Sequence, residues 1–457
     1  MRIIEISVTD LFGVFNHTIP LNTDERVTII HGPNGFGKTI LLRMLDGLFN
    51  GSYSELSSIP YQRFQIRFDE GRVVWADKAR SGPTPTQPTL LEVEGDIERR
   101  RSRRRERPPT VIINLLRPNA IEPESFALDT ISDEIDIPLA AIATITPELD
   151  QVGPRSWIDH STGETLSLEG VLSRFGHLLP FELSREPDWW TEVQESIDIR
   201  LIKAQRLLAI RAADRRRRRL EMIPVVEEFS QELAETIQRK LAESAALSQS
   251  LDRTFPIRLV EQMGRSELTE DELRRRLSEL EKQRSRLEEV GLLDREEGIA
   301  FLPPSELSSS TKDVLEVYVQ DVEKKLSAFD EIADKIELFK QIINARFLYK
   351  QIAISKQDGF SFTTSDGKPL PVAALSSGEQ HELVLLYQLL FKASPNSLIL
   401  IDEPELSLHI AWQKQFLGDL QGIAKLASLD VLIATHSPQI IHDRWDLTVE
   451  LKGPAIS

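Results

Sequence analysis

The sequence contains no cysteine in 457 residues. That absence excludes disulfide bonds, zinc sites built on thiolates and cysteine nucleophiles. Long apolar runs are also missing, since no window approaches the roughly 18 uninterrupted apolar residues of a membrane-spanning helix. The start of the chain, MRIIEISVTD, has neither the basic region nor the apolar region of a secretory signal peptide. We therefore expect a cytoplasmic protein that binds no membrane.

Positive charge is in the minority, since 55 Lys and Arg stand against 72 Asp and Glu, for a net charge of -17. A protein that coats nucleic acid over most of its surface is basic, so the average argues against that class. Two arginine clusters depart from the average, at residues 99–107 and 215–219. A run of like charge is usually a solvated face, but guanidinium groups also pair with phosphates. Contact with nucleic acid through these two clusters therefore stays open.

The remaining composition, 40% hydrophobic and 28% charged, is that of a globular protein, and the length predicts two or three structural units. Near the start, residues 3–8 and 27–30 have the spacing of strands, and residues 39–48 have the spacing of a helix. A glycine-rich turn separates the second strand from the helix, which is the setting that a phosphate-binding loop requires. Residues 64–78 predict a hairpin, and residues 199–204 predict a short strand.

The middle of the chain, from about residue 213 to residue 349, has helical spacing. Its clearest apolar stripe runs from Leu315 to Phe347 in steps of three and four, with candidate caps at residues 308–311. That stripe predicts one helix of roughly 60 Å at 1.5 Å per residue. Shorter stripes that begin at Val226 and Leu273 predict partner helices. We expect an antiparallel helical hairpin or small bundle, in which these stripes are packing seams.

The end of the chain returns to the strand period. A hairpin is predicted around Asp358 and Gly359. Beyond it, helical spacing at 377–391 and 409–426 alternates with strand spacing at 398–401 and 431–434. This alternation predicts a largely parallel sheet with covering helices.

Sheet elements therefore lie at both ends of the chain, with the helical block between them. We expect an α/β head in two lobes, residues 1–212 and 350–457, interrupted by a helical, coiled-coil-like arm at residues 213–349.

The strongest local signal is GPNGFGKT at residues 32–39, which satisfies G-x-x-x-x-G-K-[ST]. The glycines let backbone N–H groups turn inward and cradle phosphate oxygens. Lys38 reaches the β- and γ-phosphates, and Thr39 offers its hydroxyl to Mg²⁺. We predict that ATP and Mg²⁺ bind here. The predicted binding residues of this loop are Gly32, Asn34, Gly35, Gly37, Lys38 and Thr39.

A second signal is the apolar strand at residues 398–401 that ends in Asp402 and Glu403. A buried strand of this kind delivers Asp402 to the metal, directly or through water. Glu403 is placed to polarise an attacking water. The alternative interpretation is a strand that merely ends in acids facing solvent. The complete phosphate loop in the same chain argues against that interpretation.

The segment LSSGEQ at residues 375–380 opens a helix before Asp402 and resembles the ABC signature motif, with Ser377 where the first glycine usually stands. The order of phosphate loop, signature, acidic pair and then His436 resembles the ABC ATPase superfamily. The resemblance implies an ABC-type head, with a mixed or parallel sheet, split by the helical insertion. It also implies that the signature of one head closes on nucleotide held by another head of a homo-oligomer. The signature residues concerned are Ser376, Ser377, Gly378 and Glu379.

The same resemblance assigns three further positions. His436 resembles the switch histidine that senses the γ-phosphate, and Gln205 holds the Q-loop position, where it would contact the metal and the water. Either residue alone would more often be an ordinary loop side chain. Residues 406–409 occupy the D-loop position, with His409 where an aspartate is common. Whether the two nucleotide sites of paired heads communicate through this loop is therefore an open question. No aromatic residue stands out as a partner for adenine.

Within the superfamily, LSSGEQHELVLLYQLLF, LILIDEPELSLH and LIATHSPQII resemble the OLD-like branch of bacterial ATPases. The closest resemblance is to the ATPase subunit of the PARIS anti-phage defence system. OLD nucleases carry a Toprim domain after the head, and this sequence ends soon after His436. We therefore expect any nuclease to act in trans. The PARIS resemblance implies a Toprim-type nuclease partner, held by a homo-oligomeric ATPase and released when a phage protein is sensed.

Two other classes share the head-and-arm organisation or the motifs. A repair or chromosome-type ATPase would clamp DNA directly, which the acidic average disfavours and the arginine clusters keep open. The energising subunit of a transporter has a compact helical subdomain, whereas a long insertion separates Gln205 from Ser376 here.

Overall fold

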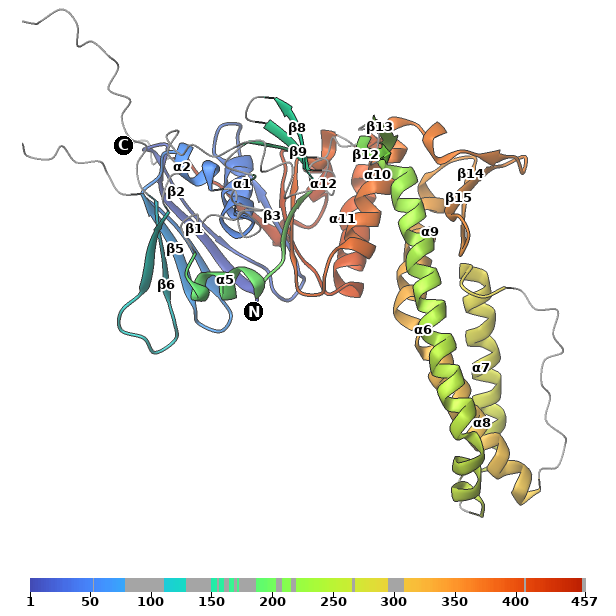
Figure 1. Ribbon diagram of the computed structural model, residues 1–457. Helices are drawn as coiled ribbons and strands as arrows, with labels where there is room; N and C mark the ends of the chain where they lie inside the picture. The colour runs from blue at the N-terminus through green and yellow to red at the C-terminus, as the bar shows by residue number, and fades with distance from the viewer. Residues whose placement is uncertain are drawn as a thin grey trace, which may run out of the picture. The chain divides into compact units, whose positions relative to one another are not determined.

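The chain forms two compact units in the computed structural model (Figure 1). The first contains Met1–Ala204, Ala393–Leu406 and Gln413–Ser457, and the second contains Gln205–Lys392 and Ser407–Trp412. The structure describes residues 1–51, 53–78, 111–128, 149–153, 156–159, 164–167, 171, 186–202, 208–214, 219–264, 268–294, 308–406 and 408–453.

An antiparallel sheet of six strands forms one layer of the first unit, in the order β2-β1-β4-β5-β6-β7. Its strands alternate buried and exposed side chains, as in β4, where Phe64, Ile66 and Phe68 are buried. The β4–β5 hairpin confirms the hairpin predicted at residues 64–78. The strands are β1 (Ile3–Leu11), β2 (Phe15–Pro20), β4 (Arg63–Phe68), β5 (Val73–Lys78), β6 (Val111–Leu116) and β7 (Glu124–Leu128).

A parallel sheet of five strands forms the second layer, in the order β11-β17-β18-β3-β19. Its central strands are runs of Val, Ile and Leu buried on both faces, as expected of a covered parallel sheet. The largely parallel sheet predicted from the sequence is confirmed. The strands are β3 (Val27–His31), β11 (Ile199–Ile202), β17 (Leu398–Asp402), β18 (Asp430–Ala434) and β19 (Thr448–Glu450).

Helix α1 (Lys38–Phe49) packs into the hydrophobic core that the two sheets share. Leu41, Leu45 and Leu48 are buried in that core together with side chains of both sheets. The strand, loop and helix predicted near the start of the chain are thereby confirmed as β3, the glycine-rich turn and α1. The remaining helices of this unit include α2 (Ser54–Ser58), α5 (Asp188–Glu195), α11 (Ile410–Leu426) and α12 (Pro438–Ile441), and a small sheet contains β8 (Leu149–Gly153), β9 (Ser156–Asp159) and β10 (Glu164–Ser167).

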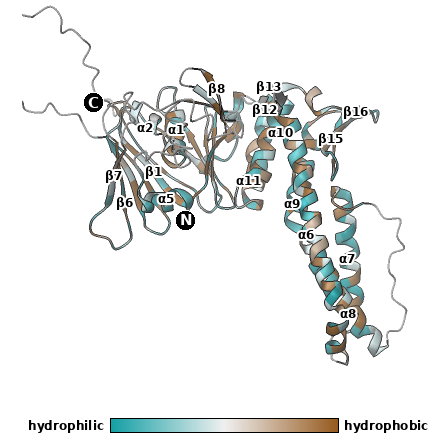
Figure 2. Cartoon of the chain, in the orientation of Figure 1, coloured by the Kyte–Doolittle hydropathy of each residue, from teal (hydrophilic) through white to brown (hydrophobic). Residues whose placement is uncertain are grey.

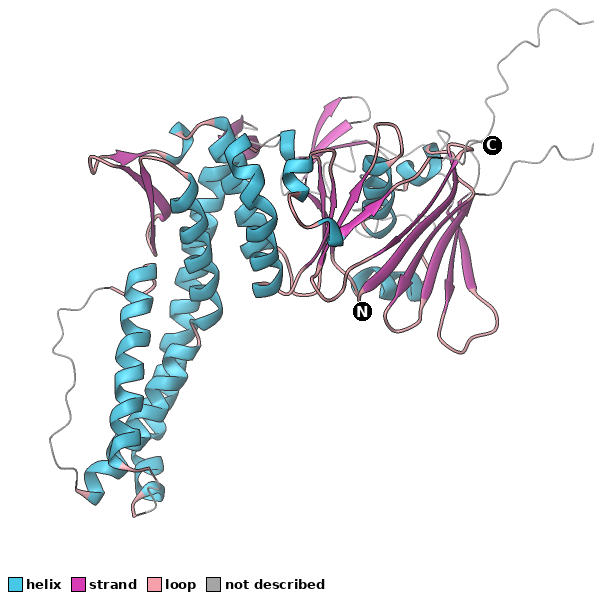
Figure 3. Cartoon of the chain, turned by 180° about the vertical axis from the view of Figure 1, so that it is seen from behind, coloured by secondary structure: helices cyan, strands magenta, loops and turns pink. Residues whose placement is uncertain are grey.

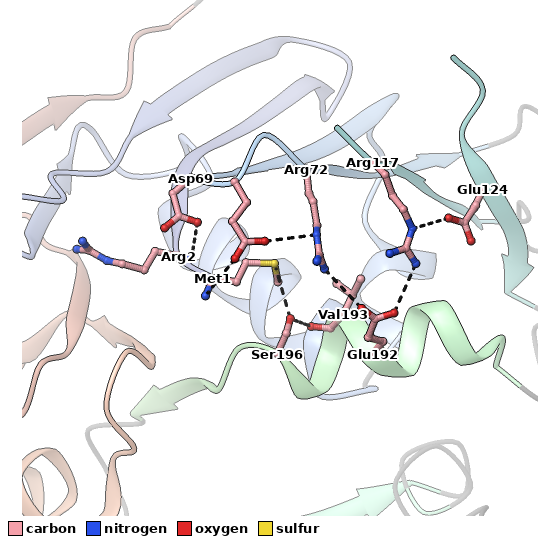
Figure 4. A network of polar contacts seen from close by, with 10 residues as sticks. Met1, Arg2, Asp69, Arg72, Arg117, Glu124, Glu192, Val193 and Ser196 are labelled. Atoms are coloured by element: carbon pink, nitrogen blue, oxygen red, sulfur yellow. Dashed lines mark hydrogen bonds and ion pairs between the residues drawn. The ribbon is translucent and has the colours of Figure 1, made fainter. Parts of the chain in front are cut away.

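Helix α5 is held against the antiparallel sheet by buried Trp190 and by a surface network of charges. In Figure 4, Arg72 and Arg117 both reach Glu192, at 3.9 and 3.5 Å, and Arg117 also binds Glu124 at 2.8 Å. Exposed ion pairs of this kind contribute little, so the apolar contact of Trp190 is the main attachment.

The second unit contains the long helices α6 (Val225–Gln262), α7 (Glu270–Val290), α8 (Ser309–Ser327) and α9 (Asp330–Arg346). Helix α8 packs against both α6 and α7, and α7 also contacts α9 (Figure 3). The helices alternate hydrophilic and hydrophobic bands along their length in Figure 2, as amphipathic helices do. The small helical bundle expected from the sequence, and the α/β class with a helical insertion, are confirmed.

Two details of the helical prediction are wrong. The single helix predicted from Leu315 to Phe347 is two helices, because the chain turns at Phe329, whose N–H donates to Leu326 O at 3.0 Å. The three-and-four spacing of apolar residues continues through this turn in the sequence, so spacing alone could not reveal it. Helix also does not begin near residue 213, because the hairpin β12 (Leu208–Asp214) and β13 (Arg219–Pro224) precedes α6. Pro224 is extended, with φ -60 and ψ 130, and is the residue directly before the first turn of α6.

The second unit ends in a hairpin and a helix. Strands β14 (Lys350–Ser355), β15 (Gly359–Thr364) and β16 (Pro369–Leu370) form a small antiparallel sheet, which confirms the predicted hairpin around Gly359. Gly359 has φ +67, and a Cβ there would lie 1.7 Å from Ser230 O on α6, so only glycine fits this contact. Helix α10 (Ser377–Tyr387) follows and continues as a π turn over Gln388–Lys392. Among the described helices, none combines the length and apolar character needed to cross a membrane.

Candidate functional site

Three loops meet where parallel strands of the first unit end. The glycine-rich turn follows β3, Asp402 ends β17, and Thr435 follows β18. Strand β18 pairs with both other strands, with Ala434 opposite Ile30 on one side and opposite Asp402 on the other. Because carboxyl ends of neighbouring parallel strands lie at one edge of a sheet, the three loops are adjacent. The candidate site is this edge of the sheet.

The predicted phosphate loop, including Gly32, Asn34 and Gly35, forms the turn between β3 and α1. Gly37, the residue before α1, has φ +88, and a Cβ there would lie 2.6 Å from Leu11 Cδ2 on β1. A side chain at this position would be strained by the positive φ and would displace the end of the Leu11 side chain, which accounts for the glycine. The backbone N–H groups of the first turn of α1 face the loop, as an anion site requires.

The Lys38 ammonium lies inside the loop. It donates to Gly32 O at 2.8 Å and to Pro33 O at 3.1 Å. Burial lowers the pKa of Lys38, and the carboxylates of Glu403 and Asp402 oppose that shift. A cation so placed, with only carbonyl oxygens as its loop partners, can transfer to phosphate oxygens when they enter the turn.

Thr39 and Asp402 bring two oxygen ligands together, since Thr39 Oγ1 donates to Asp402 Oδ1 at 3.0 Å. Burial raises the pKa of Asp402, the Thr39 hydroxyl opposes that shift, and the nearby Glu403 adds to it. A half-buried carboxylate beside a hydroxyl fits Mg²⁺, which prefers oxygen ligands and binds through one or two protein groups with the rest from phosphate and water. In the described part of the chain no cluster of three or more His, Asp or Glu could hold a metal by itself.

Glu403 and His436 face each other beside Lys38. His436 Nε2 lies 3.8 Å from Glu403 Oε1, and His436 Nδ1 lies 3.4 Å from Lys38 Nζ. Glu403 has φ +44, which is uncommon for a residue other than glycine, and its N–H donates to Ala434 O at 2.8 Å. The backbone of Glu403 is therefore held in a strained conformation by the neighbouring strand β18.

Glu405 is a member of the site that the sequence analysis missed. It lies in a short 3₁₀ turn, Pro404–Leu406, directly after Glu403. Its Oε1 accepts from Thr435 Oγ1 at 2.8 Å and from the His436 N–H at 2.9 Å. The third acid in DEPE was the available signal, but nothing in the spacing distinguishes it from a solvated side chain.

The signature residues belong to the second unit. Ser376 caps α10, and its Oγ accepts from the Glu379 N–H at 3.4 Å while Glu379 Oε2 accepts from the Ser376 N–H at 2.8 Å. Lys350 Nζ binds both oxygens of Glu379, at 2.6 and 2.7 Å. Burial tends to raise the pKa of Glu379, but the hydrogen bonds from Lys350 and Ser376 outweigh it and hold that pKa below its usual value. The helix start that carries Ser377 and Gly378 is therefore fixed by a complete capping box.

Several predicted positions lie outside the described residues. They are Gln205, the arginine cluster at residues 99–107, and residues 215–218, while Arg219 begins β13. His409 is described and belongs to the second unit, where its ring lies 5.7 Å from the ring of Trp412.

An apolar turn beside the phosphate loop was also missed from the sequence. The β1–β2 turn exposes 38% of Phe12 and 47% of Val14. The same hairpin contacts the loop through Phe15, whose ring lies 5.2 Å from that of Phe36, and through His17, whose Nε2 lies 2.9 Å from Phe36 O. Phe12 and Val14 therefore offer exposed apolar surface next to the phosphate site.

Comparison with known proteins gives a family and distant structural relatives. No curated protein matches the chain. The Smc head domain of Pyrococcus furiosus, solved with an extended coiled coil and bound to the C-terminal domain of ScpA, is 12% identical, with a TM-score of 0.33 over 96% of this chain and 91% of that one. The SMC head domain from Thermotoga maritima is 10% identical, with a TM-score of 0.32 over 96% and 91%.

The family model described as "AAA domain, putative AbiEii toxin, Type IV TA system" matches residues 157–442. This range covers β17, β18 and the signature helix α10. Because the match extends over more than half of the 457 residues, the chain belongs to this family of AAA domains.

Proposed function

We propose that the protein binds ATP with Mg²⁺ at the edge of the parallel sheet and hydrolyses it. The observation that carries the proposal is the convergence of Lys38, the Thr39–Asp402 pair and the Glu403–His436 pair on three adjacent loops. A cation for phosphate, two oxygen ligands for a metal, and a carboxylate beside an imidazole are the parts that phosphoryl transfer to water requires.

Each side chain has a distinct task in this proposal. Lys38 exchanges the carbonyl oxygens of Gly32 and Pro33 for phosphate oxygens. Thr39 and Asp402 hold Mg²⁺, which when bound neutralises charge on the phosphates. Glu403 orients the attacking water, and His436 contacts the γ-phosphate between Lys38 and Glu403.

Adenine would pack on the exposed apolar surface of Phe12 and Val14 in the β1–β2 turn. An aromatic face and an aliphatic side chain beside the phosphate loop suit a purine ring, since stacking contributes about 1–3 kcal/mol per base. Replacing Phe12 by Ala is expected to weaken the binding of ATP more than the binding of inorganic triphosphate, which has no base.

The site is completed by a second copy of the chain in this proposal. The start of α10, with Ser376, Ser377 and Gly378, presents a serine hydroxyl and helix N-terminal amides, which suit a γ-phosphate. ATP then joins two heads, and hydrolysis releases them. The resemblance of LSSGEQ to the ABC signature supports this arrangement.

Lys38→Ala tests nucleotide binding. The phosphates lose their cationic partner, so affinity for ATP is expected to fall about 10- to 100-fold, the equivalent of one or two charged hydrogen bonds. Isothermal titration calorimetry measures the change. Lys425→Ala, an exposed lysine on α11, is the matched control and should bind as the wild type does. Equal affinity in wild type and Lys38→Ala would contradict the proposal.

The biological role that we propose is the sensor and scaffold of an anti-phage defence system, with a Toprim-type nuclease held in trans and released on sensing a phage protein. The OLD-like and PARIS-like segments support it. The family description, which names a toxin–antitoxin system, agrees with a chain that works with a second component. The test is to express the chain with the product of its flanking gene and to weigh the complex with and without ATP. A chain that never retains that product would contradict this role.

Direct clamping of DNA is the alternative, and the arginine clusters at residues 99–107 and 215–219 favour it. It predicts DNA binding that needs ATP and weakens steeply with salt, because each phosphate contact releases counterions. Fluorescence anisotropy with duplex DNA between 50 and 200 mM salt, on the order of the range where counterion release is strong, separates the two roles.

A further inference from the structure

Glu405 connects two of the three loops of the site. Its Oε1 is shared by two donors from the loop after β18, Thr435 Oγ1 at 2.8 Å and the His436 N–H at 2.9 Å. Thr435 is fully buried, so its hydroxyl has no access to bulk water. Hydrogen bonds to a carboxylate are stronger than neutral ones, particularly where water is excluded.

The loop after β18 is held in more than one place. Thr435 Oγ1 accepts from the Ser437 N–H at 2.9 Å, which extends the contact of Glu405 to the next residue. Gln413 on α11 donates to Glu405 O at 3.3 Å and accepts from Ser437 Oγ at 3.3 Å. The turn that contains Glu405 and the loop that contains His436 are therefore bound as one piece.

The His436 ring extends from this fixed backbone and lies between the other two loops. Its Nδ1 is 3.4 Å from Lys38 Nζ, and its Nε2 is 3.8 Å from Glu403 Oε1. The orientation of the ring depends on the backbone at His436, and that backbone is bound by a residue two positions after Glu403. A shift of either loop therefore moves both groups of the Glu403–His436 pair.

The second oxygen of Glu405, Oε2, is buried and has no hydrogen-bond partner within the part of the chain that the structure describes. A buried carboxylate oxygen without a partner is unfavourable. An apolar side chain would avoid that cost, but it would leave the Thr435 hydroxyl and the His436 N–H without their acceptor. These two bonds to the loop after β18 offset the cost of the unpartnered oxygen.

We propose that Glu405 is a positioning residue that fixes His436 relative to Glu403, so that the imidazole and the water-orienting carboxylate keep one geometry. This inference rests on the proposed function, in which Glu403 and His436 act on the γ-phosphate. In this proposal Glu405 acts through His436 and not on the reacting atoms, since its Oε1 is occupied by Thr435 and His436 and its Oε2 is buried.

The test has one arm that needs no ATP. Hydrogen exchange of the nucleotide-free protein is followed in the peptide that spans residues 431–437. In Glu405→Ala the His436 amide loses its acceptor and is expected to exchange about tenfold faster or more. Glu405→Gln keeps an acceptor oxygen and is expected to exchange as the wild type does. Thr435→Val removes one of the two donors to Glu405 and keeps the shape of the side chain. Its exchange rate is expected to lie between those of Glu405→Gln and Glu405→Ala.

The second arm measures steady-state ATP hydrolysis. Glu405→Ala is expected to lower kcat about tenfold or more while KM for ATP stays within about twofold, because the phosphate loop is untouched. Glu405→Gln should recover most of kcat. The control is Glu124→Ala on β7, which removes a carboxylate bound to Arg117 at the surface of the same unit and should leave both arms unchanged.

The outcomes separate the two proposals. If the His436 amide of Glu405→Ala exchanged at the wild-type rate, the role of Glu405 would be overturned. It would also be overturned if the kcat of Glu405→Gln were as low as that of Glu405→Ala. A wild-type chain that hydrolyses no ATP would overturn the proposed function instead, and the exchange arm would still decide whether Glu405 holds the His436 loop.

Discussion

Single residues at the site show a balance between burial and charge, and Asp402 shows it most clearly. Burial raises its pKa, and Glu403 adds to that shift. A raised carboxyl pKa means that the folded protein binds this proton more tightly than the unfolded chain does. The stability contributed by the proton is present at low pH and is lost as pH rises through the raised pKa. The ionised Asp402 carboxylate, which is to bind the metal, therefore lowers the free energy of unfolding of the nucleotide-free protein.

Asp402→Asn tests that balance. The amide removes the half-buried charge and can still accept from the Thr39 hydroxyl. We expect a higher midpoint of thermal unfolding than wild type at neutral pH, without nucleotide, and a difference that shrinks as pH falls through the raised pKa. Hydrolysis should be lost, because the amide is a poor ligand for Mg²⁺. Differential scanning fluorimetry across pH measures the first effect, and a variant less stable than wild type at neutral pH would contradict it.

Glu403 is the residue on which hydrolysis should depend. Glu403→Gln keeps the size of the side chain and removes the carboxylate that orients water. We expect ATP affinity close to that of the wild type. We expect kcat to fall by at least about 100-fold, in the range found for loss of a general base. A phosphate-release assay, together with calorimetry, separates the two quantities. Turnover at the wild-type rate would remove Glu403 from the proposed mechanism.

At the scale of elements, the signature helix and α8 begin in the same way. Ser376 caps α10 and Ser308 caps α8, each through a hydroxyl that accepts from a backbone N–H three residues on. Ser376→Ala and Ser308→Ala should each cost about 1 kcal/mol of unfolding free energy. Only Ser376→Ala should also slow ATP turnover, because only that serine is proposed to contact phosphate. Equal turnover in the two variants would show that Ser376 is a cap and nothing more.

The elements differ in how far the sequence predicted them. Residues 27–49 could be read as strand, turn and helix because the period changes there and the turn needs glycine at Gly37. The break at Phe329 was missed because the apolar stripe continues through it, although two acids at the start of α9 suit a helix N-terminus. Glu405 was missed because its role depends on β17 and β18 lying side by side, a contact between distant segments that a local pattern does not contain.

At the scale of the whole molecule, the central question is whether Ser376 acts on nucleotide bound by its own chain or by another copy. Two variants decide it, each expected to be inactive alone at an ATP concentration that saturates only the wild type. Lys38→Ala cannot hold the phosphates, and Ser376→Arg places a long side chain where the γ-phosphate should meet α10. If the site is shared, a mixed dimer contains one intact site, made from Lys38 of the Ser376→Arg chain and Ser376 of the Lys38→Ala chain.

An equal mixture of the two variants is therefore expected to recover about a quarter of wild-type turnover. Random pairing makes half of the dimers mixed, and each of those has one good site of two. The recovered activity should rise with protein concentration, since it depends on association between chains. If each chain completes its own site, the mixture stays as inactive as its components, because no single chain carries both residues. A mixture without activity, from variants shown by unfolding to be folded, would therefore locate Ser376 away from any nucleotide held by a second copy.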